Sequence, residues 1–132
     1  MENRPYKILY VDDQPEMIEL VQLALRRLDF EVCGASDGRL ALDLMRNTRL
    51  DLVLLDLMLP GWDGWQVTEA MQADALLKHL PVILVTARVA NAWAGRQPPP
   101  ADAYITKPFS LEELRSVVQS VLGQTRKLAQ AI

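Results

Sequence analysis

The chain has 132 residues, half of them hydrophobic, and a net charge of −3. This size is typical of one domain with a core large enough to fold without disulfides, and the single cysteine, Cys33, excludes an intramolecular disulfide. The acidic balance gives no basic footprint for nucleic acid, no apolar stretch approaches the ~20 residues of a membrane helix, and the N-terminus lacks the apolar segment of a secretion signal. We therefore expect a cytoplasmic protein that binds neither nucleic acid nor membrane directly.

Short apolar runs alternate with segments of helical periodicity along the chain. Helix starts are indicated by Pro15, which suits a first turn, by Asp37 as an N-cap, and by Ser110 with Glu113 in a capping box. A further helix is expected over about 65–77. The expected strands cover residues 6–11, 31–35, 50–56, 82–86 and 103–106.

Strands that alternate with helices indicate an α/β fold, with a doubly wound parallel sheet and right-handed crossovers. The strands are almost continuously apolar, as expected when helices cover both faces of the sheet. We expect one domain over residues 1–132, with a core of about 6–122. Gly123 is expected to end the last helix, which leaves 124–132 as a C-terminal extension.

The segment between the fourth and fifth strands departs from this alternation, because Pro98, Pro99 and Pro100 stand where a fourth helix should end. Proline lacks the amide donor of a helix and clashes with the preceding turn. We therefore expect a short or irregular fourth helix of at most about two turns, followed by an extended, mobile segment. Trp93 is the large apolar residue of this region, and we expect it to pack on the last helix.

Polar side chains end four of the expected strands. Asp12 and Asp13 follow the first strand, Asp56 ends the third, Thr86 ends the fourth, and Lys107 follows the fifth. Because the carboxyl ends of parallel strands face one crevice, where such folds bind ligands, we expect these side chains to meet.

Three clustered carboxylates repel one another, at about 4 kcal/mol for a pair 4 Å apart at an effective dielectric constant of 20. A divalent cation removes this repulsion, and Mg²⁺ prefers oxygen ligands. Cys33 and His79 do not form a competing ligand set, and His79 is expected in a surface loop. Mg²⁺ beside a further carboxylate, a hydroxyl and an ammonium group is suited to phosphoryl transfer, in which a carboxylate can be the nucleophile.

The ordered set of these motifs resembles the receiver domains of two-component response regulators, over about residues 6–122. The matching segments are Asp12-Asp13, the run from Leu54 through Asp56 to Gly64, Val85-Thr86-Ala87, and the run from Tyr104 through Lys107-Pro108 to Phe109. The resemblance implies a five-stranded, flavodoxin-like sheet of order 2-1-3-4-5. It also implies a signalling phosphoacceptor rather than an enzyme.

The resemblance also implies a role for each matching residue. Asp56 accepts a phosphoryl group from a phosphohistidine of a sensor histidine kinase or a histidine phosphotransfer protein. Mg²⁺, or Mn²⁺, is bound directly by Asp13, with Asp12 assisting, and Asp56 and the backbone carbonyl of Met58 complete the protein ligands.

The remaining roles concern charge and switching. Lys107 pairs with Asp56 and then with the phosphoryl oxygens, and the peptide bond between Lys107 and Pro108 is expected to be cis. Thr86 moves toward the phosphoryl group, and Tyr104 turns inward behind it. Trp62 and Trp65 flank the site and are expected to cover the start of the third helix.

Two alternatives stay open. A pseudo-receiver would be a docking module independent of phosphorylation, and the intact set of Asp56, Thr86 and Lys107 argues against it. A metal-dependent phosphatase of the aspartate-nucleophile type would need a second aspartate where this chain has Met58. The downstream target, or a fused output domain, is undetermined. The unusual region before the fifth strand favours a monomer or a weak dimer.

Overall fold

The computed structural model of the chain describes residues 5–87 and 97–131. These residues form a five-stranded parallel sheet in the order β2-β1-β3-β4-β5, which confirms the expected architecture. The strands are β1 (Lys7–Val11), β2 (Glu31–Ala35), β3 (Leu52–Asp56), β4 (Val82–Ala87) and β5 (Ala103–Lys107). The helices are α1 (Pro15–Arg26), α2 (Gly38–Asn47), α3 (Gly64–Gln72) and α4 (Leu111–Ala131).

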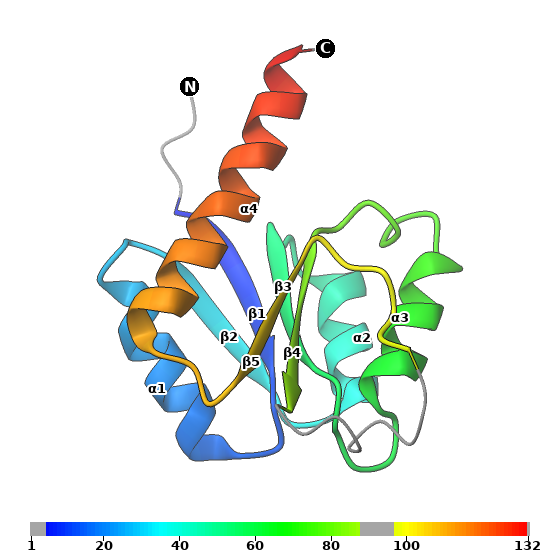
Figure 1. The fold of residues 1–132 in the computed structure, drawn as a ribbon. Helices are drawn as coiled ribbons and strands as arrows, with labels where there is room; N and C mark the ends of the chain where they lie inside the picture. Colours follow the sequence, from blue (N-terminus) through cyan, green and yellow to red (C-terminus); the bar gives the residue numbers. More distant parts are fainter. Residues whose placement is uncertain (1–4, 88–96, 132) are drawn as a thin grey trace.

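The helices cover the sheet from both sides, with α1 and α4 on one face and α2 and α3 on the other (Figure 1). Alternate residues of the central strands β1, β3 and β4 point into two separate cores. Leu9, Val53 and Leu84 belong to the core under α2 and α3. Ile8, Leu54, Ile83 and their neighbours form the core under α1 and α4. Because helices cover both faces of the sheet, polar side chains can reach solvent mainly at the ends of the strands.

The sequence signals for helix starts are confirmed for α1, α2 and α4. Pro15 occupies the first turn of α1, the Asp37 carboxylate accepts a hydrogen bond from the Leu40 amide at 2.8 Å, and Ser110 Oγ accepts one from the Glu113 amide at 3.0 Å. The Asp37 and Ser110 side chains each satisfy an amide that the helix itself leaves unpaired.

Aspartates also close the amino end of the sheet. The Asp51 carboxylate accepts a hydrogen bond from the Lys7 amide at 2.8 Å, and the Asp51 amide donates to the Lys7 carbonyl at 2.8 Å. Asp102 makes the same pair of bonds with Val82, both at 2.9 Å. Each aspartate thus extends the ladder between two neighbouring strands by one reciprocal pair.

Helix α3 is shorter than expected. It ends at Gln72 rather than near Leu77, because the Asp74 carboxylate accepts a hydrogen bond from the Leu76 amide at 2.8 Å. That bond favours a new turn over a continued helix. Arg46 of α2 lies 3.2 Å from the same carboxylate and holds it in place.

Helix α4 is longer than expected. It runs through Gly123 to Ala131, so Gly123 does not end it. A single glycine costs a helix interior about 1 kcal/mol, and the glutamine, lysine, leucine and alanine residues that follow are good helix formers. The expectations for a fourth helix over 88–96 and for the packing of Trp93 lie outside the described residues.

Among the described residues, no helix combines the length and the apolar character that crossing a bilayer requires.

Candidate functional site

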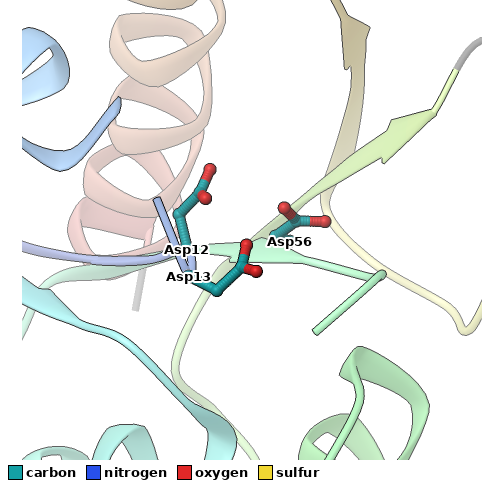
Figure 2. A group of neighbouring side chains, drawn as sticks. All are labelled: Asp12, Asp13 and Asp56. Atoms are coloured by element: carbon teal, nitrogen blue, oxygen red, sulfur yellow. The ribbon is translucent and has the colours of Figure 1, made fainter. Parts of the chain in front are cut away.

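Three carboxylates meet at the carboxyl end of the sheet. Asp12 and Asp13 directly follow β1, and Asp56 is the last residue of β3. One carboxylate oxygen from each lies within 4.8 Å of the others. Figure 2 shows the three carboxyl groups gathered between the ends of the two strands. The cluster forms because β1 and β3 are adjacent and parallel, with Val11 paired to Leu55.

The three carboxylates differ in exposure. Asp12 is fully buried and Asp56 is 5% exposed, whereas Asp13 faces solvent. Burying a charged group is unfavourable unless the group is paired. Asp12 and Asp56 are both paired with Lys107. Its Nζ lies 2.8 Å from Asp12 Oδ2 and 2.9 Å from Asp56 Oδ2. Lys107 therefore links the ends of β1, β3 and β5.

The electrostatics of Asp56 and Lys107 follow from this arrangement. Burial raises the pKa of Asp56 above its usual value of 3.8, and hydrogen bonds from Lys107 and from the Met58 amide oppose the shift. Partial burial by itself lowers the pKa of Lys107, but its bonds to Asp12 and Asp56 outweigh burial and raise it. The lysine therefore stays charged beside the buried carboxylates.

The loop after β3 holds Asp56 from the other side. The Met58 amide donates to Asp56 Oδ1 at 2.9 Å, and the Gly64 amide donates to the Leu57 carbonyl at 3.0 Å. A Cβ on Gly64 would lie 2.6 Å from Leu57 Cα, so only glycine lets α3 begin this close to the site. Gly61 turns the loop at a φ of +70°, a left-handed geometry that glycine adopts without strain.

Thr86 and Tyr104 lie on neighbouring strands beside this cluster. Thr86 is buried and follows Val85, which pairs with Asp56. Tyr104 is 47% exposed, and its Oη donates to the Pro99 carbonyl at 2.8 Å. The Lys107–Pro108 peptide bond is cis, the geometry that the resemblance implied. Tyr104 therefore points outward in this structure.

Residues 97–102 belong to neither a helix nor a strand and are anchored at three points. Trp65 Nε1, in the first turn of α3, donates to the Gln97 carbonyl at 2.8 Å. Tyr104 binds the Pro99 carbonyl, and Asp102 forms its bond pair with Val82. Sequence reasoning missed the anchors at Gln97 and Pro99, because the backbone carbonyls that accept these bonds carry no residue-type signal.

Two further features of the site were missed. Asp63 and Gln66, to which the sequence analysis gave no role, form a full capping box at the start of α3. Tyr10 was counted only as part of an apolar strand, yet its Oη donates to Asp12 Oδ2 at 2.6 Å. Burial and the nearby carboxylates of Asp12 and Asp56 raise the pKa of Tyr10 far above its usual value, so the phenol is a neutral donor.

The charge balance tests whether a metal fits here. The described cluster contains three carboxylates and one lysine, Lys107, which forms ion pairs with two of them. The cluster therefore carries an excess of two negative charges. An all-oxygen set with one exposed member suits a hard cation that keeps several waters, as Mg²⁺ does. Asp12, Asp13 and Asp56 therefore fit a divalent cation.

Comparison with known proteins gives a consistent result. Residues 8–119 match the family model described as the response regulator receiver domain. The chain is 37% identical over 124 residues to the DNA-binding response regulator MtrA of Mycolicibacterium smegmatis, which covers 92% of this chain and 53% of the relative. It is 35% identical over 127 residues to the DNA-binding dual master transcriptional regulator RpaA of Synechocystis, covering 95% and 52%. The chain thus spans about half the length of the curated relatives it matches.

Solved structures show the same fold. The receiver domain of the sensor histidine kinase PA1611 from Pseudomonas aeruginosa superimposes with a TM-score of 0.83 at 28% identity, covering 90% of this chain and 98% of that one. That structure contains a magnesium ion coordinated in its active site cleft. The chemotaxis response regulator CheY4 of Vibrio cholerae gives a TM-score of 0.79 at 26% identity, covering 89% and 98%.

Proposed function

Because this chain belongs to the family of response regulator receiver domains, we propose that it accepts a phosphoryl group on Asp56 in a Mg²⁺-dependent reaction. The observation that carries this proposal is the pairing of Asp56 with Lys107 inside a cluster of three carboxylates. The family consists of signalling domains of two-component systems rather than enzymes, so the phosphorylated state is the signal.

The donor in this proposal is a phosphohistidine of a histidine kinase or a histidine phosphotransfer protein. A carboxylate oxygen of Asp56 forms a bond to phosphorus while the bond from phosphorus to the histidine nitrogen breaks, and the histidine takes up a proton. Asp56 is poised for attack because Lys107 and the Met58 amide hold one oxygen each. After transfer, Lys107 is placed to bind the phosphoryl oxygens.

Asp12, Asp13 and Asp56 would hold Mg²⁺, with the backbone carbonyl of Met58 as a further ligand. The bound ion supplies neutralisation of the negative charge that two buried carboxylates and a phosphoryl group bring together. Asp13 is the exposed member of the cluster and is accessible from solvent.

Incubation with acetyl phosphate and Mg²⁺, followed by intact mass measurement, tests this function. We expect one added phosphoryl group on the wild-type chain and on Asp51→Asn, and none on Asp56→Asn or in EDTA. Asp51 is a matched control because it directly precedes the first residue of β3, whereas Asp56 is the last residue of that strand. Phosphorylation of Asp56→Asn would refute the assignment, and an unmodified wild type would return the chain to the alternative of a phosphorylation-independent docking module.

We further propose that Thr86 and Tyr104 carry the switch. The pairing of the strands supports this coupling between Asp56, Thr86 and Tyr104. Thr86 follows Val85, the partner of Asp56, and Tyr104 pairs with Leu84, two residues before Thr86. Inward rotation of Tyr104 requires the loss of its bond to the Pro99 carbonyl. Phosphorylation would thereby release one of the three anchors of residues 97–102.

Fluorine NMR of protein labelled with 3-fluorotyrosine tests the switch, because the chain has only three tyrosines. The Tyr104 signal is assigned with Tyr104→Phe. We expect phosphorylation to shift this signal in wild type and to leave it unchanged in Asp56→Asn. A Tyr104 signal that stays fixed on full phosphorylation would contradict the switch while leaving the phosphoacceptor assignment intact.

A further inference from the structure

Tyr10 places a phenol inside the core that α1 and α4 cover. Its side chain is fully buried, and its neighbours in that core are aliphatic, among them Ile8, Leu54 and Ile83. A hydroxyl in such surroundings is unfavourable unless it forms a hydrogen bond. The phenol forms that bond with Asp12 Oδ2, at the short distance of 2.6 Å that is typical of a charged acceptor.

Strand geometry aims the phenol at the site. Side chains two residues apart on a strand point to the same face, so Tyr10 and Asp12 both face the core under α1 and α4. Tyr10 pairs with Leu54 of β3, two residues before Asp56. The phenol therefore reaches the acidic cluster from the buried core under α1 and α4.

The hydrogen bonds of Asp12 show what this contact does. Asp12 Oδ2 accepts from both Tyr10 Oη and Lys107 Nζ, and Oδ1 accepts from the Gln14 amide at 2.9 Å. An ionised carboxylate offers about four acceptor positions, two on each oxygen. Oδ2 is thus filled, and Oδ1 keeps one position for a cation or for a water bound to it.

We propose that Tyr10 is a positioning residue that fixes the orientation of Asp12 for Mg²⁺, an inference that rests on the proposed function of the acidic cluster. Lys107 alone could not hold this orientation, because it also binds Asp56 and is placed to follow a phosphoryl group there. Tyr10 and the Gln14 amide hold Asp12 independently of the lysine. This role requires the phenol of Tyr10. An aliphatic residue at this position would fill the core but would leave Asp12 with one hydrogen-bond donor fewer.

The competing explanation is a core tyrosine that bonds the nearest acceptor, as buried tyrosines usually do. The two explanations differ in their consequences for ion selectivity. Mg²⁺ demands near-ideal octahedral geometry, whereas Ca²⁺ accepts variable geometry. Loss of a positioning contact should therefore weaken Mg²⁺ binding much more than Ca²⁺ binding.

The experiment compares wild type, Tyr10→Phe and Tyr6→Phe by calorimetric titration with Mg²⁺ and, separately, with Ca²⁺. Tyr6→Phe is the control, because it removes a phenol just before the start of β1, where the ring packs on Phe30. We expect Tyr10→Phe to raise the Mg²⁺ dissociation constant about tenfold, the lower range for loss of a contact behind a metal ligand, and to change the Ca²⁺ constant by less than about threefold. Tyr6→Phe should match wild type for both ions.

Equal Mg²⁺ affinity in wild type and Tyr10→Phe, or a parallel loss of both ions, would overturn the inference while the phosphoacceptor proposal stands. A wild type that binds no Mg²⁺ would overturn both. If Tyr10→Phe does not fold, fluorine NMR of the wild type labelled with 3-fluorotyrosine decides: Mg²⁺ should shift the Tyr10 signal and leave that of Tyr6 in place. A Tyr10 signal that is unmoved at saturating Mg²⁺ would overturn the role.

Discussion

Aspartates stand at both ends of the same sheet, and they have opposite surroundings. At the amino end, the carboxylates of Asp51 and Asp102 each accept a hydrogen bond from one backbone amide of a neighbouring strand. At the carboxyl end, Asp12, Asp13 and Asp56 face one another around a single lysine. The amino-end aspartates complete the ladder between strands, whereas the carboxyl-end aspartates carry more negative charge than their one lysine neutralises. The contacts of an aspartate, rather than its position at a strand end, therefore indicate its role.

The largest expected effect is the response of the two ends to Mg²⁺. An ion at 100 times its dissociation constant stabilises the folded state by about 2.7 kcal/mol through linkage. Asp13→Asn should lose most of the Mg²⁺-induced rise in melting temperature, whereas Asp51→Asn should keep it. Thermal unfolding with and without Mg²⁺ measures both, and an equal rise in wild type and Asp13→Asn would contradict the metal site.

The next effect is on stability without metal. Asp51→Ala and Asp102→Ala should each lower the free energy of unfolding by about 1–2 kcal/mol, because each leaves a strand amide without its carboxylate acceptor. Asp13→Asn should instead raise it, since one of three repelling charges is removed. Urea unfolding in EDTA measures the three values, with Asp43→Asn on the exposed side of α2 as the control. Stabilisation by Asp102→Ala would break the comparison.

A smaller effect concerns the anchored segment at residues 97–102. Trp65→Phe removes the donor to the Gln97 carbonyl, and we expect a loss of about 0.5–1.5 kcal/mol. Hydrogen exchange should be faster at the Asp102 amide, which donates to the Val82 carbonyl. Trp62→Phe removes an indole from the preceding loop and is the control. Unchanged exchange at the Asp102 amide in Trp65→Phe would show that this bond does not hold the segment.

The smallest effect concerns Asp74, which turns the chain after α3. Bonds from the Leu76 amide and from Arg46 lower the pKa of Asp74 below its usual value of 3.8. A lowered folded-state pKa means that the stabilisation is present above the unfolded value and is lost as the pH falls through the folded value. Asp74→Asn should therefore flatten the acid end of the stability profile slightly. A profile identical to that of wild type, measured by urea unfolding from pH 6 to pH 2, would show that the carboxylate contributes nothing.

Signals that lie close together in the sequence predicted most of the fold and the cluster. The apolar strands, with polar residues at their ends, indicated the parallel sheet and the convergence of Asp12, Asp56 and Lys107. Asp37 and Ser110 predicted their helix starts, because a cap and its amide are three residues apart.

Most of the features that were missed depend on contacts between distant residues or on single side chains; the capping box of Asp63 and Gln66 is the local exception. Asp51 and Lys7 are 44 residues apart, and Trp65 and Gln97 are 32 apart, so neither pair leaves a local pattern. Tyr10 was hidden because a tyrosine suits an apolar strand by propensity alone. The glycine at 123 was expected to end α4, but neighbouring helix formers outweigh one glycine.

Locating the phosphoryl group itself tests the central claim most directly. The wild-type chain would be phosphorylated with acetyl phosphate and Mg²⁺, digested, and sequenced by tandem mass spectrometry under conditions that preserve acyl phosphates. We predict a single modified position, Asp56, with Asp12, Asp13 and Asp51 unmodified. A phosphoryl group on any of these three, or on a residue away from the carboxyl end of the sheet, would contradict the account.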